Sequence, residues 1–307
     1  MNLRELIKES NSESSSVLNF SWFLKKQGYS EATIISRVKL MKVLVKRGAN
    51  FDDPESVKGV IAQQDWSGGR KQNAVYMYSC YLKMLGRSWS APNYRRVDKI
   101  PFIPTEFEID QLIAGVGFNV SFFLRFLKET GARCGEAFQL RWEDVDFERN
   151  TVSVVPEKSS KPRIFSLSSD LMNIFRDRMK SEGLVFGAGT KSLTHFRKTF
   201  ERQKKVLASK LCNPRLNRIS FHTFRHWKAT MLYHQTRDVL YVMNFLGHKN
   251  IKNTLIYVQM EEALFKTQNN EFLCKVASTI DEARILIESG FELVCDIDGC
   301  KMFRRRK

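Results

Sequence analysis

Side chains that could act on a phosphodiester stand close together in the last third of the sequence. His222 and Arg225 belong to the run His-Thr-Phe-Arg-His, His248 follows a Leu-Gly pair, and Tyr257 comes shortly afterwards. Displacement at phosphorus builds negative charge on the non-bridging oxygens, and the forked donors of an arginine can stabilise that charge without a metal. The imidazoles can add hydrogen bonds, and the phenol becomes a useful nucleophile if a base or a cationic pocket favours loss of its proton.

Two further cations stand upstream of this group. Arg133 lies in the segment Thr-Gly-Ala-Arg-Cys-Gly-Glu, and Lys158 lies at the tip of an expected β-hairpin. Arg133 would give the phosphate a second forked donor. Lys158 could protonate the leaving 5′ oxygen if nearby arginines lower its pKa, although Lys161 is close enough to be a rival for that role. Together these residues outline an active site for attack on a phosphodiester without a metal ion.

At these segments the chain resembles the tyrosine recombinase family, the phage-integrase-like enzymes that cut and rejoin DNA through a 3′-phosphotyrosyl bond. The first-arginine box, the lysine hairpin, the His-x-x-Arg-His box, the Leu-Gly-His box and the final tyrosine occur in the family's order between about Thr105 and Gln259. The tail after the tyrosine is similar to the ends of some archaeal integrases, which suggests a mobile-element origin.

The resemblance implies a role for each residue of the set. The assignments are nucleophile for Tyr257, phosphate clamp for Arg133 and Arg225, general base or hydrogen-bond partner for His222, transition-state donor for His248 and general acid for Lys158. Glu157 and Ser159 stand where the family commonly has glycine beside the lysine, and Phe224 stands where it has leucine. The lysine hairpin thus departs from the family pattern at both neighbours of Lys158.

Each motif taken singly has a plainer structural reading. Two side chains one turn apart, as in His-x-x-Arg, are ordinary on a surface helix, and the glycine before His248 is a natural helix C-cap. Tyr257 within Leu-Ile-Tyr-Val could be a core aromatic with its hydroxyl at the edge. The occurrence of all the motifs in one order favours the functional reading.

The composition agrees with a two-domain protein that binds nucleic acid. The chain has 307 residues, 43% of them hydrophobic, and a formal net charge of +17. Such an excess favours a polyanionic partner, because lysines and arginines displace the counterions of nucleic acid. The start is polar and polar residues break the apolar run 118–127, so we expect no membrane span and a cytoplasmic, nucleoid-associated protein. The six cysteines lack metal-ligand spacing, so we expect no metal and no cofactor.

The pattern predicts a mainly α fold with a small antiparallel β-sheet in the catalytic domain, and the resemblance implies a two-domain, C-shaped clamp. The expected parts are a flexible start (1–16), a helical core-DNA-binding domain (17–89), a linker (90–104), a catalytic domain (105–270) and a C-terminal extension (271–307). The cations expected to face DNA are Arg37, Arg70, Lys71, Arg95, Arg96, Lys161, Arg197 and Lys198. For each of those in the helical first domain, Arg37, Arg70 and Lys71, a solvated position on a helix face is an alternative of at least equal weight.

Local signals predict the individual elements. A capping box at 105–108 should open the catalytic domain, and 151–155 with 163–167 should be the strands of the lysine hairpin. In the extension, a capping box at 279–282 should start a helix, and 291–297 with 300–304 should form a β-hairpin. One face of this hairpin should cover the helix with Phe291, Leu293, Cys295, Ile297, Cys300 and Met302. The extension could serve protomer contacts or touch DNA, and the sequence does not decide between them.

A recombinase of this family would act on double-stranded DNA as a homotetramer on two sites, through a Holliday junction and without ATP or metal. The free protein could be a monomer, and the sequence identifies no accessory protein. Two alternatives remain: a type IB topoisomerase that relaxes DNA as a monomer, and a DNA-binding module that kept the fold and lost the chemistry. The Leu-Gly-His box argues against the first alternative, and the complete residue set argues against the second.

Overall fold

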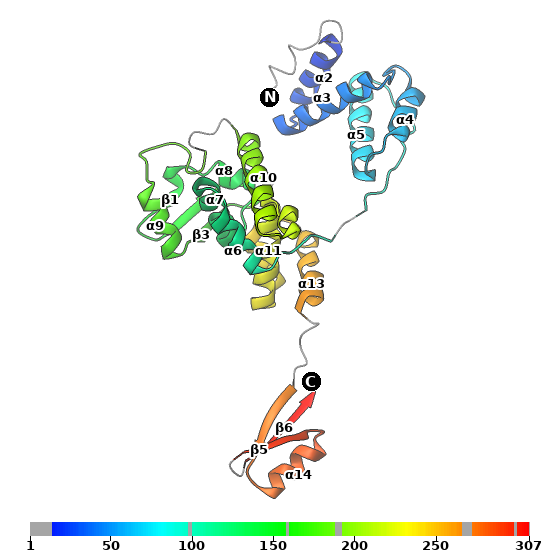
Figure 1. Ribbon diagram of the computed structural model, residues 1–307. Helices are drawn as coiled ribbons and strands as arrows, with labels where there is room; N and C mark the ends of the chain where they lie inside the picture. The colour runs from blue at the N-terminus through cyan, green and yellow to red at the C-terminus, as the bar shows by residue number, and fades with distance from the viewer. Residues whose placement is uncertain are drawn as a thin grey trace. The chain divides into compact units, whose positions relative to one another are not determined.

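Two units, each with its own hydrophobic core, make up the chain (Figure 1). The computed structural model describes residues 14–97, 100–157, 160–187, 192–265, 272–297 and 300–306. The first unit spans residues 1–99 and the second spans residues 100–307. Helices predominate in both, and the described strands form two three-stranded antiparallel sheets, so the prediction of a mainly α fold with small antiparallel sheets is confirmed.

The first unit consists of helices whose starts are set by local caps. Ser30 accepts a hydrogen bond from the amide of Thr33, and Asp53 accepts two from the first turn that follows it. The helices are α2 (Ser14–Lys26), α3 (Glu31–Lys46), α4 (Pro54–Gln63) and α5 (Gly68–Met84). Apolar side chains that recur every three or four residues form the buried face of each helix, and on α3 these are Ile34, Val38, Met41 and Leu44.

The core of the first unit extends into the segment after α5. The Tyr78 hydroxyl donates to the Phe51 carbonyl at 2.9 Å, and the Trp89 ring meets the Tyr78 ring edge-on at 4.7 Å. Burial raises the pKa of Tyr78 to about 12, so this phenol stays protonated. The side chain of Gln72 accepts the Tyr94 amide at 2.8 Å. Residues 89–94 therefore pack on the first unit.

The second unit is built around α7 and α11, which pack against each other, and α11 also contacts α12 and α13 (Figure 1). The phenylalanines of α7 form an aromatic cluster with those of the surrounding elements, for example Phe123 with Phe196 and Phe221 at 5.1 Å each. Up to residue 265 the helices are α6 (Glu106–Gly115), α7 (Phe118–Thr130), α8 (Cys134–Phe138), α9 (Ser169–Asp177), α10 (Leu193–Lys210), α11 (Phe221–Thr236), α12 (Val239–Leu246) and α13 (Lys252–Phe265), with 3₁₀ turns η1 (Trp142–Asp144) and η2 (Pro214–Arg218).

A small sheet covers one side of this helical core. Its strands are β1 (Val145–Asp146), β2 (Thr151–Val154) and β3 (Arg163–Ser166), in that order across the sheet. Val152 pairs with Phe165, and both are buried because they share the face that lies on the core. The predicted lysine hairpin is confirmed in its two strands.

The C-terminal extension contains one more strand than predicted. It consists of β4 (Phe272–Ala277), α14 (Ile280–Glu288), β5 (Glu292–Ile297) and β6 (Cys300–Arg306), with the sheet order β4-β6-β5. The capping box that starts α14 is present. The buried hydrophobic residues among the described part of the extension are Ala277, Leu286, Phe291 and Phe303.

The predicted apolar face of the extension is wrong in its register. Leu293 pairs with Phe303 whereas Cys295 pairs with Met302, because a bulge shifts the register between the two β5 residues. Neighbouring residues of β6 point to opposite faces, so Leu293 and Cys295 cannot share one. Phe303 is 1% exposed and occupies the centre, while Leu293 is 56% exposed.

Candidate active site

Helix α11 carries three polar side chains at the centre of the second unit. His222, Arg225 and His226 lie within about one turn of each other. Arg225 is 1% exposed, and its guanidinium donates to the Gly131 carbonyl at 2.8 Å and to the Leu246 carbonyl at 2.7 Å. These carbonyls belong to the ends of α7 and α12, so Arg225 holds three segments of the chain together.

The turn after α7 presents Arg133. Gly131 ends α7 in the left-handed region with φ of 58°, a conformation that glycine adopts without strain. Arg133 Nη1 donates to Glu136 Oε1 at 2.9 Å and to Ser160 Oγ at 2.5 Å, and its side chain stays 26% exposed. Burial would raise the pKa of Glu136, but the Arg133 amide and the Arg163 guanidinium outweigh it and hold that pKa below its usual value. The charged carboxylate fixes the direction of Arg133, whose exposed part can meet a phosphate.

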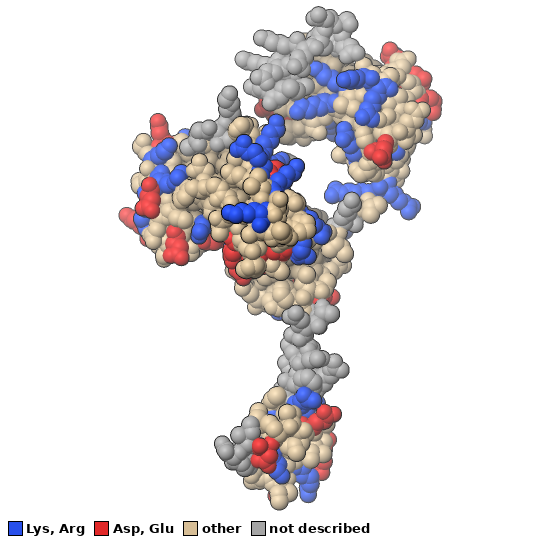
Figure 2. All heavy atoms as spheres, viewed as in Figure 1, with Lys and Arg blue, Asp and Glu red and all other residues tan. Residues whose placement is uncertain are grey.

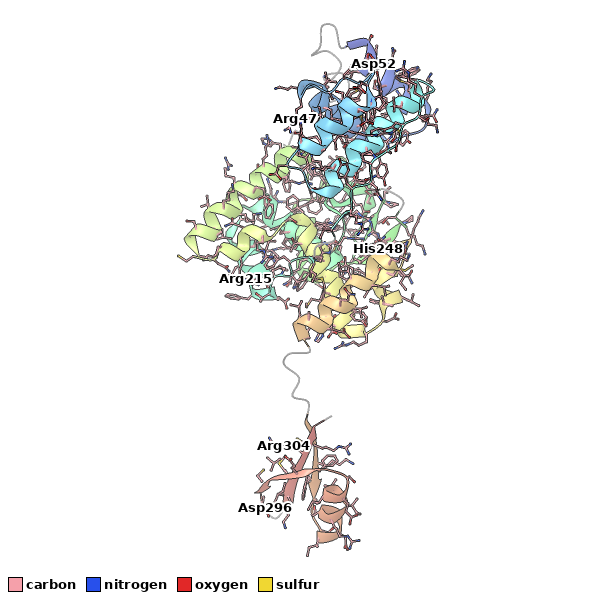
Figure 3. The ribbon with its side chains drawn as sticks, turned by 90° about the vertical axis from the view of Figure 1, so that its right-hand side faces the viewer. Arg47, Asp52, Arg215, His248, Asp296 and Arg304 are labelled. Carbon is pink, nitrogen blue, oxygen red and sulfur yellow. The ribbon has the colours of Figure 1, made fainter. Side chains whose placement is uncertain are left out.

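His248 lies on the loop that joins α12 to α13 (Figure 3). Gly247 ends α12 with φ of 69°, and the His248 amide then donates to the Met243 carbonyl at 2.9 Å. The ring Nδ1 lies 2.8 Å from Thr254 Oγ1, which fixes the ring orientation. Burial, assisted by Arg225, lowers the pKa of His248 to about 4, so the imidazole is neutral at neutral pH. A neutral ring still has one N–H donor, which is enough for a hydrogen bond to a phosphate oxygen.

Tyr257 lies on α13 with its hydroxyl 3.2 Å from Nδ1 of His226, and the residue is only 3% exposed. Burial raises the pKa of Tyr257, while Arg225 and Arg133 act in the opposite direction. The pKa of His226 is lowered to about 4, mainly by burial and further by His222 and Arg225. The neutral His226 ring can therefore accept a hydrogen bond from the phenol.

The sequence did not single out His226 for chemistry, although it ends the His-x-x-Arg-His box. The His222 and His226 rings meet edge-on at 4.6 Å, and burial also lowers the pKa of His222. It is His226 whose ring nitrogen contacts the Tyr257 hydroxyl. One residue along a helix turns the side chain by about 100°, so the neighbour of Arg225 can face α13 while Arg225 faces α7 and α12. The position of His226 next to Arg225 on the helix was therefore the sequence feature that could have identified it as a partner of Tyr257.

The structure thus gathers five of the six predicted catalytic residues in one electrostatic environment. Burial and then Arg225 and Arg133 lower the pKa of His222 and of His248, and the same two arginines oppose the burial that raises the pKa of Tyr257. The sixth, Lys158, lies outside the described residues.

Two of the predicted DNA-facing cations of the second unit, Arg197 and Lys161, have contacts with the segments of this cluster. Arg197 on α10 donates to Sγ of Cys134, the residue after Arg133, at 3.4 Å. Lys198 and Lys161 are exposed. Figure 2 shows Lys and Arg side chains gathered along α10, whereas acidic side chains lie over α6. Helix α10 therefore gives the site a cationic flank.

In the first unit, the predicted cations are partly engaged with aromatic rings. Arg37 lies 4.3 Å from the ring centroid of Tyr29 and Arg70 lies 4.5 Å from that of Trp66. Lys71 donates to a backbone carbonyl of α4 at 2.9 Å. The two remaining cations of the set, Arg95 and Arg96, are exposed.

Metal-ligand clusters and membrane-spanning helices are both absent from the described ranges. Within them, no group of three or more His, Cys, Asp or Glu residues could hold a metal ion. No helix in the same ranges is both long enough and apolar enough to cross a membrane.

Two arginines, three histidines and a tyrosine gathered on one helical unit define a protein of the tyrosine recombinase class. The model of the phage integrase family matches residues 107–263, a range that contains all of these side chains. The chain belongs to the phage integrase family.

Its relatives agree with this assignment. The tyrosine recombinase XerA of Saccharolobus solfataricus is 28% identical over 159 residues, which cover 51% of this chain and 50% of XerA. A tyrosine recombinase of Thermosipho africanus is 31% identical over 183 residues, which cover 56% of this chain and 61% of that protein. The chain thus covers less than two thirds of either relative. The solved integrase of transposon Tn1549, in complex with transposon right end DNA, shares the fold with a TM-score of 0.60 and 15% identity, covering 89% of this chain and 98% of that one.

Proposed function

We propose that this chain is a site-specific DNA recombinase that cleaves and rejoins strands through a covalent 3′-phosphotyrosyl intermediate. The observation that carries the proposal is the buried Tyr257 hydroxyl beside His226, in the field of Arg225 and Arg133. A phenol in this position has a proton acceptor next to it and cations that favour both its ionisation and a bound phosphate. The net charge of +17 and the relatives named as tyrosine recombinases support DNA as the substrate.

In the proposed cleavage step, the Tyr257 oxygen attacks phosphorus and the bond from phosphorus to the 5′ oxygen breaks. The phenol proton passes to a neutral imidazole, either that of His226 at 3.2 Å or that of His222 beside it. A histidine with a pKa of about 4 is a weak base. Proton transfer is therefore favourable only as the phosphate binds and the new bond consumes the phenolate.

The remaining groups act on the charge that develops at phosphorus. Arg133 and Arg225 stabilise the non-bridging oxygens, and His248 donates a further hydrogen bond to them. Lys158 gives a proton to the leaving 5′ oxygen, with Lys161 as the rival donor. Arg225 has a pKa of about 10, lowered mainly by burial, so it remains charged at neutral pH.

The phosphotyrosyl bond conserves the energy of the broken phosphodiester. A 5′ hydroxyl from another strand can therefore reverse the attack without ATP. In the proposed cycle, four protomers on two double-stranded sites exchange one pair of strands, pass through a Holliday junction and then exchange the second pair.

A suicide DNA substrate nicked beside the cleavage site tests the proposal. The wild-type chain should form a covalent adduct and Tyr257→Phe should form none. Tyr241→Phe is a matched control, because Tyr241 is a 47% exposed tyrosine on α12, and it should react as the wild type does. Absence of a wild-type adduct on DNA captured from a library would leave a DNA-binding module. An adduct with relaxation of any supercoiled plasmid, independent of sequence, would indicate a type IB topoisomerase.

A further inference from the structure

A buried arginine that the reaction scheme does not use joins the hairpin to the active site. Arg163, the first residue of β3, is 7% exposed. Its Nη2 donates to Glu136 Oε2 at 2.5 Å and its Nη1 donates to the Leu246 carbonyl at 2.6 Å. Glu136 also binds Arg133, and the Leu246 carbonyl also accepts from Arg225. Arg163 therefore shares a partner with each arginine of the proposed phosphate clamp.

The residues on both sides of the hairpin tip are fastened to the same two segments. Before the tip, the Glu157 amide donates to Glu136 Oε1 at 3.3 Å. After the tip, Ser160 Oγ and the Lys161 amide donate to the Gly247 carbonyl at 3.0 and 3.2 Å. Glu157 is thus joined to the arginine box, and Ser160 and Lys161 are joined to the Leu-Gly-His box.

Fold stability alone does not account for Arg163. Burying a guanidinium is costly unless every donor is satisfied, and apolar residues of similar volume often give equal or greater stability. The Nε of Arg163 is buried and has no hydrogen-bond partner among the described residues. A Cβ at Gly247 would lie 2.9 Å from Cδ of Arg163 and 3.0 Å from the Lys161 carbonyl oxygen, so the chain leaves space for the arginine at that position.

We propose that Arg163 is a positioning residue that holds the described hairpin residues, Glu157 and Ser160 to Lys161, against the arginine box and the His248 loop, so that a lysine of this hairpin meets the leaving 5′ oxygen. The inference rests on the proposed function and deepens it. Arg163 itself touches neither phosphate nor leaving group. The two terminal nitrogens of its guanidinium bind a carboxylate and a carbonyl at the same time. A lysine has a single terminal nitrogen and cannot reproduce this geometry.

DNA with sulfur in place of the 5′ bridging oxygen separates this role from a merely structural one. A thiolate leaves without a proton, since a thiol has a pKa of about 8.5, far below that of an alcohol. For Arg163→Met, we expect cleavage of ordinary DNA to fall by about 10²-fold or more while cleavage of the sulfur substrate stays within about threefold of wild type. Single-turnover adduct formation on both substrates gives these rates.

Three variants complete the experiment. Arg163→Lys should show the same split as Arg163→Met, because charge alone does not restore the bridge. Arg133→Met should cleave both substrates much more slowly than the wild type, since sulfur at the bridging position does not stabilise the charge on the non-bridging oxygens. Arg149→Met is the matched control, because Arg149 has a side chain that is 83% exposed near the same sheet, and it should match the wild type on both.

The pattern of losses decides the outcome. Equal losses of Arg163→Met on the two substrates, or no loss on either, would overturn the proposal. If Arg163→Met does not fold, judged by its thermal unfolding and DNA binding, Arg163→Lys provides the same comparison, and equal losses there overturn the proposal as well. A wild-type chain that cleaves neither substrate would refute the proposed function itself, a result that differs from every pattern above.

Discussion

The helix that carries Tyr257 is anchored by a buried carboxylate. This anchor allows us to predict which of its substitutions destabilises the helix more. Glu261 follows Tyr257 by one turn of α13 and its side chain is 1% exposed. It accepts hydrogen bonds from Arg237 and, at 2.9 Å, from Nδ1 of His234, both at the C-terminal end of α11. The side chains of Arg237 and His234 are 55% and 37% exposed, so the carboxylate is the only fully buried member of this trio.

The burial of one partner alone determines which substitution costs more. Glu261→Gln removes the buried charge and leaves Arg237 and His234, which water can solvate, so it should cost about 1–2 kcal/mol in charge-assisted hydrogen bonds. Arg237→Met leaves the carboxylate buried beside His234 alone, and should cost about 2–4 kcal/mol. The double variant should be more stable than Arg237→Met, because the second substitution removes the stranded charge.

Hydrogen exchange of α13 amides, followed by mass spectrometry, measures the free energy of opening this helix in the full chain. The expected order of α13 protection is wild type, then Glu261→Gln, then Arg237→Met. Arg284→Met is the control, since Arg284 forms an exposed pair with Glu288 on α14 and should leave α13 unchanged. If Glu261→Gln opened α13 more than Arg237→Met, the argument from burial would be refuted.

Three further predictions follow from the site and the charge. Because burial lowers the pKa of His226 and of His248 from 6.5 to about 4, the unfolded chain binds more protons between these values. The free energy of unfolding should therefore be highest above pH 6.5 and fall as the pH drops towards 4. Urea unfolding at pH 7 and pH 5 measures this difference. The free energy of unfolding of a His226→Asn/His248→Asn variant should depend less on pH. Gly247→Ala should destabilise the chain by about 1–3 kcal/mol, because it places a Cβ at φ of 69° against Arg163, and a thermal shift under about 1 °C would contradict this. DNA affinity should fall by about a thousandfold from low to moderate salt if about six to ten phosphates are contacted, and a flat titration would speak against the cationic footprint.

Helix boundaries could be predicted from the sequence because caps are local. Ser30, Thr105 and Thr279 each bind an amide within three residues, and Gly131 and Gly247 stop their helices with positive φ. These interactions need no knowledge of the rest of the fold. The predicted capping boxes at Thr105 and Thr279 and the helix C-cap at Gly247 are confirmed.

The contacts that give the site its chemistry could not be predicted in this way. The pairing of His226 with Tyr257 depends on how α13 packs on α11, and the bridge from Arg163 to Glu136 and Leu246 joins three distant segments. A motif shows which residue types occur in which order, whereas packing decides which ring nitrogen or guanidinium meets which partner. Arg163 was part of the recognised hairpin and lies on the same strand face as Phe165, but that pattern does not show which groups its guanidinium binds.

The register of the extension was missed for a related reason. A single extra residue in β5 reverses the side on which every earlier residue of that strand points. Alternation of apolar residues does not reveal such an insertion. Strand β4 was missed because its partner is β6, which lies more than twenty residues further along the chain.

The sheet order β4-β6-β5 also has a consequence for biosynthesis. The two outer strands emerge from the ribosome first, and neither is a neighbour of the other. Each must remain with unpaired backbone groups until residues 300–306 have been translated and supply the central strand. The sheet of the extension therefore cannot form strand by strand during translation. A nascent chain interrupted before Cys300 would carry two strands with unpaired backbone groups, which can pair with strands of other chains.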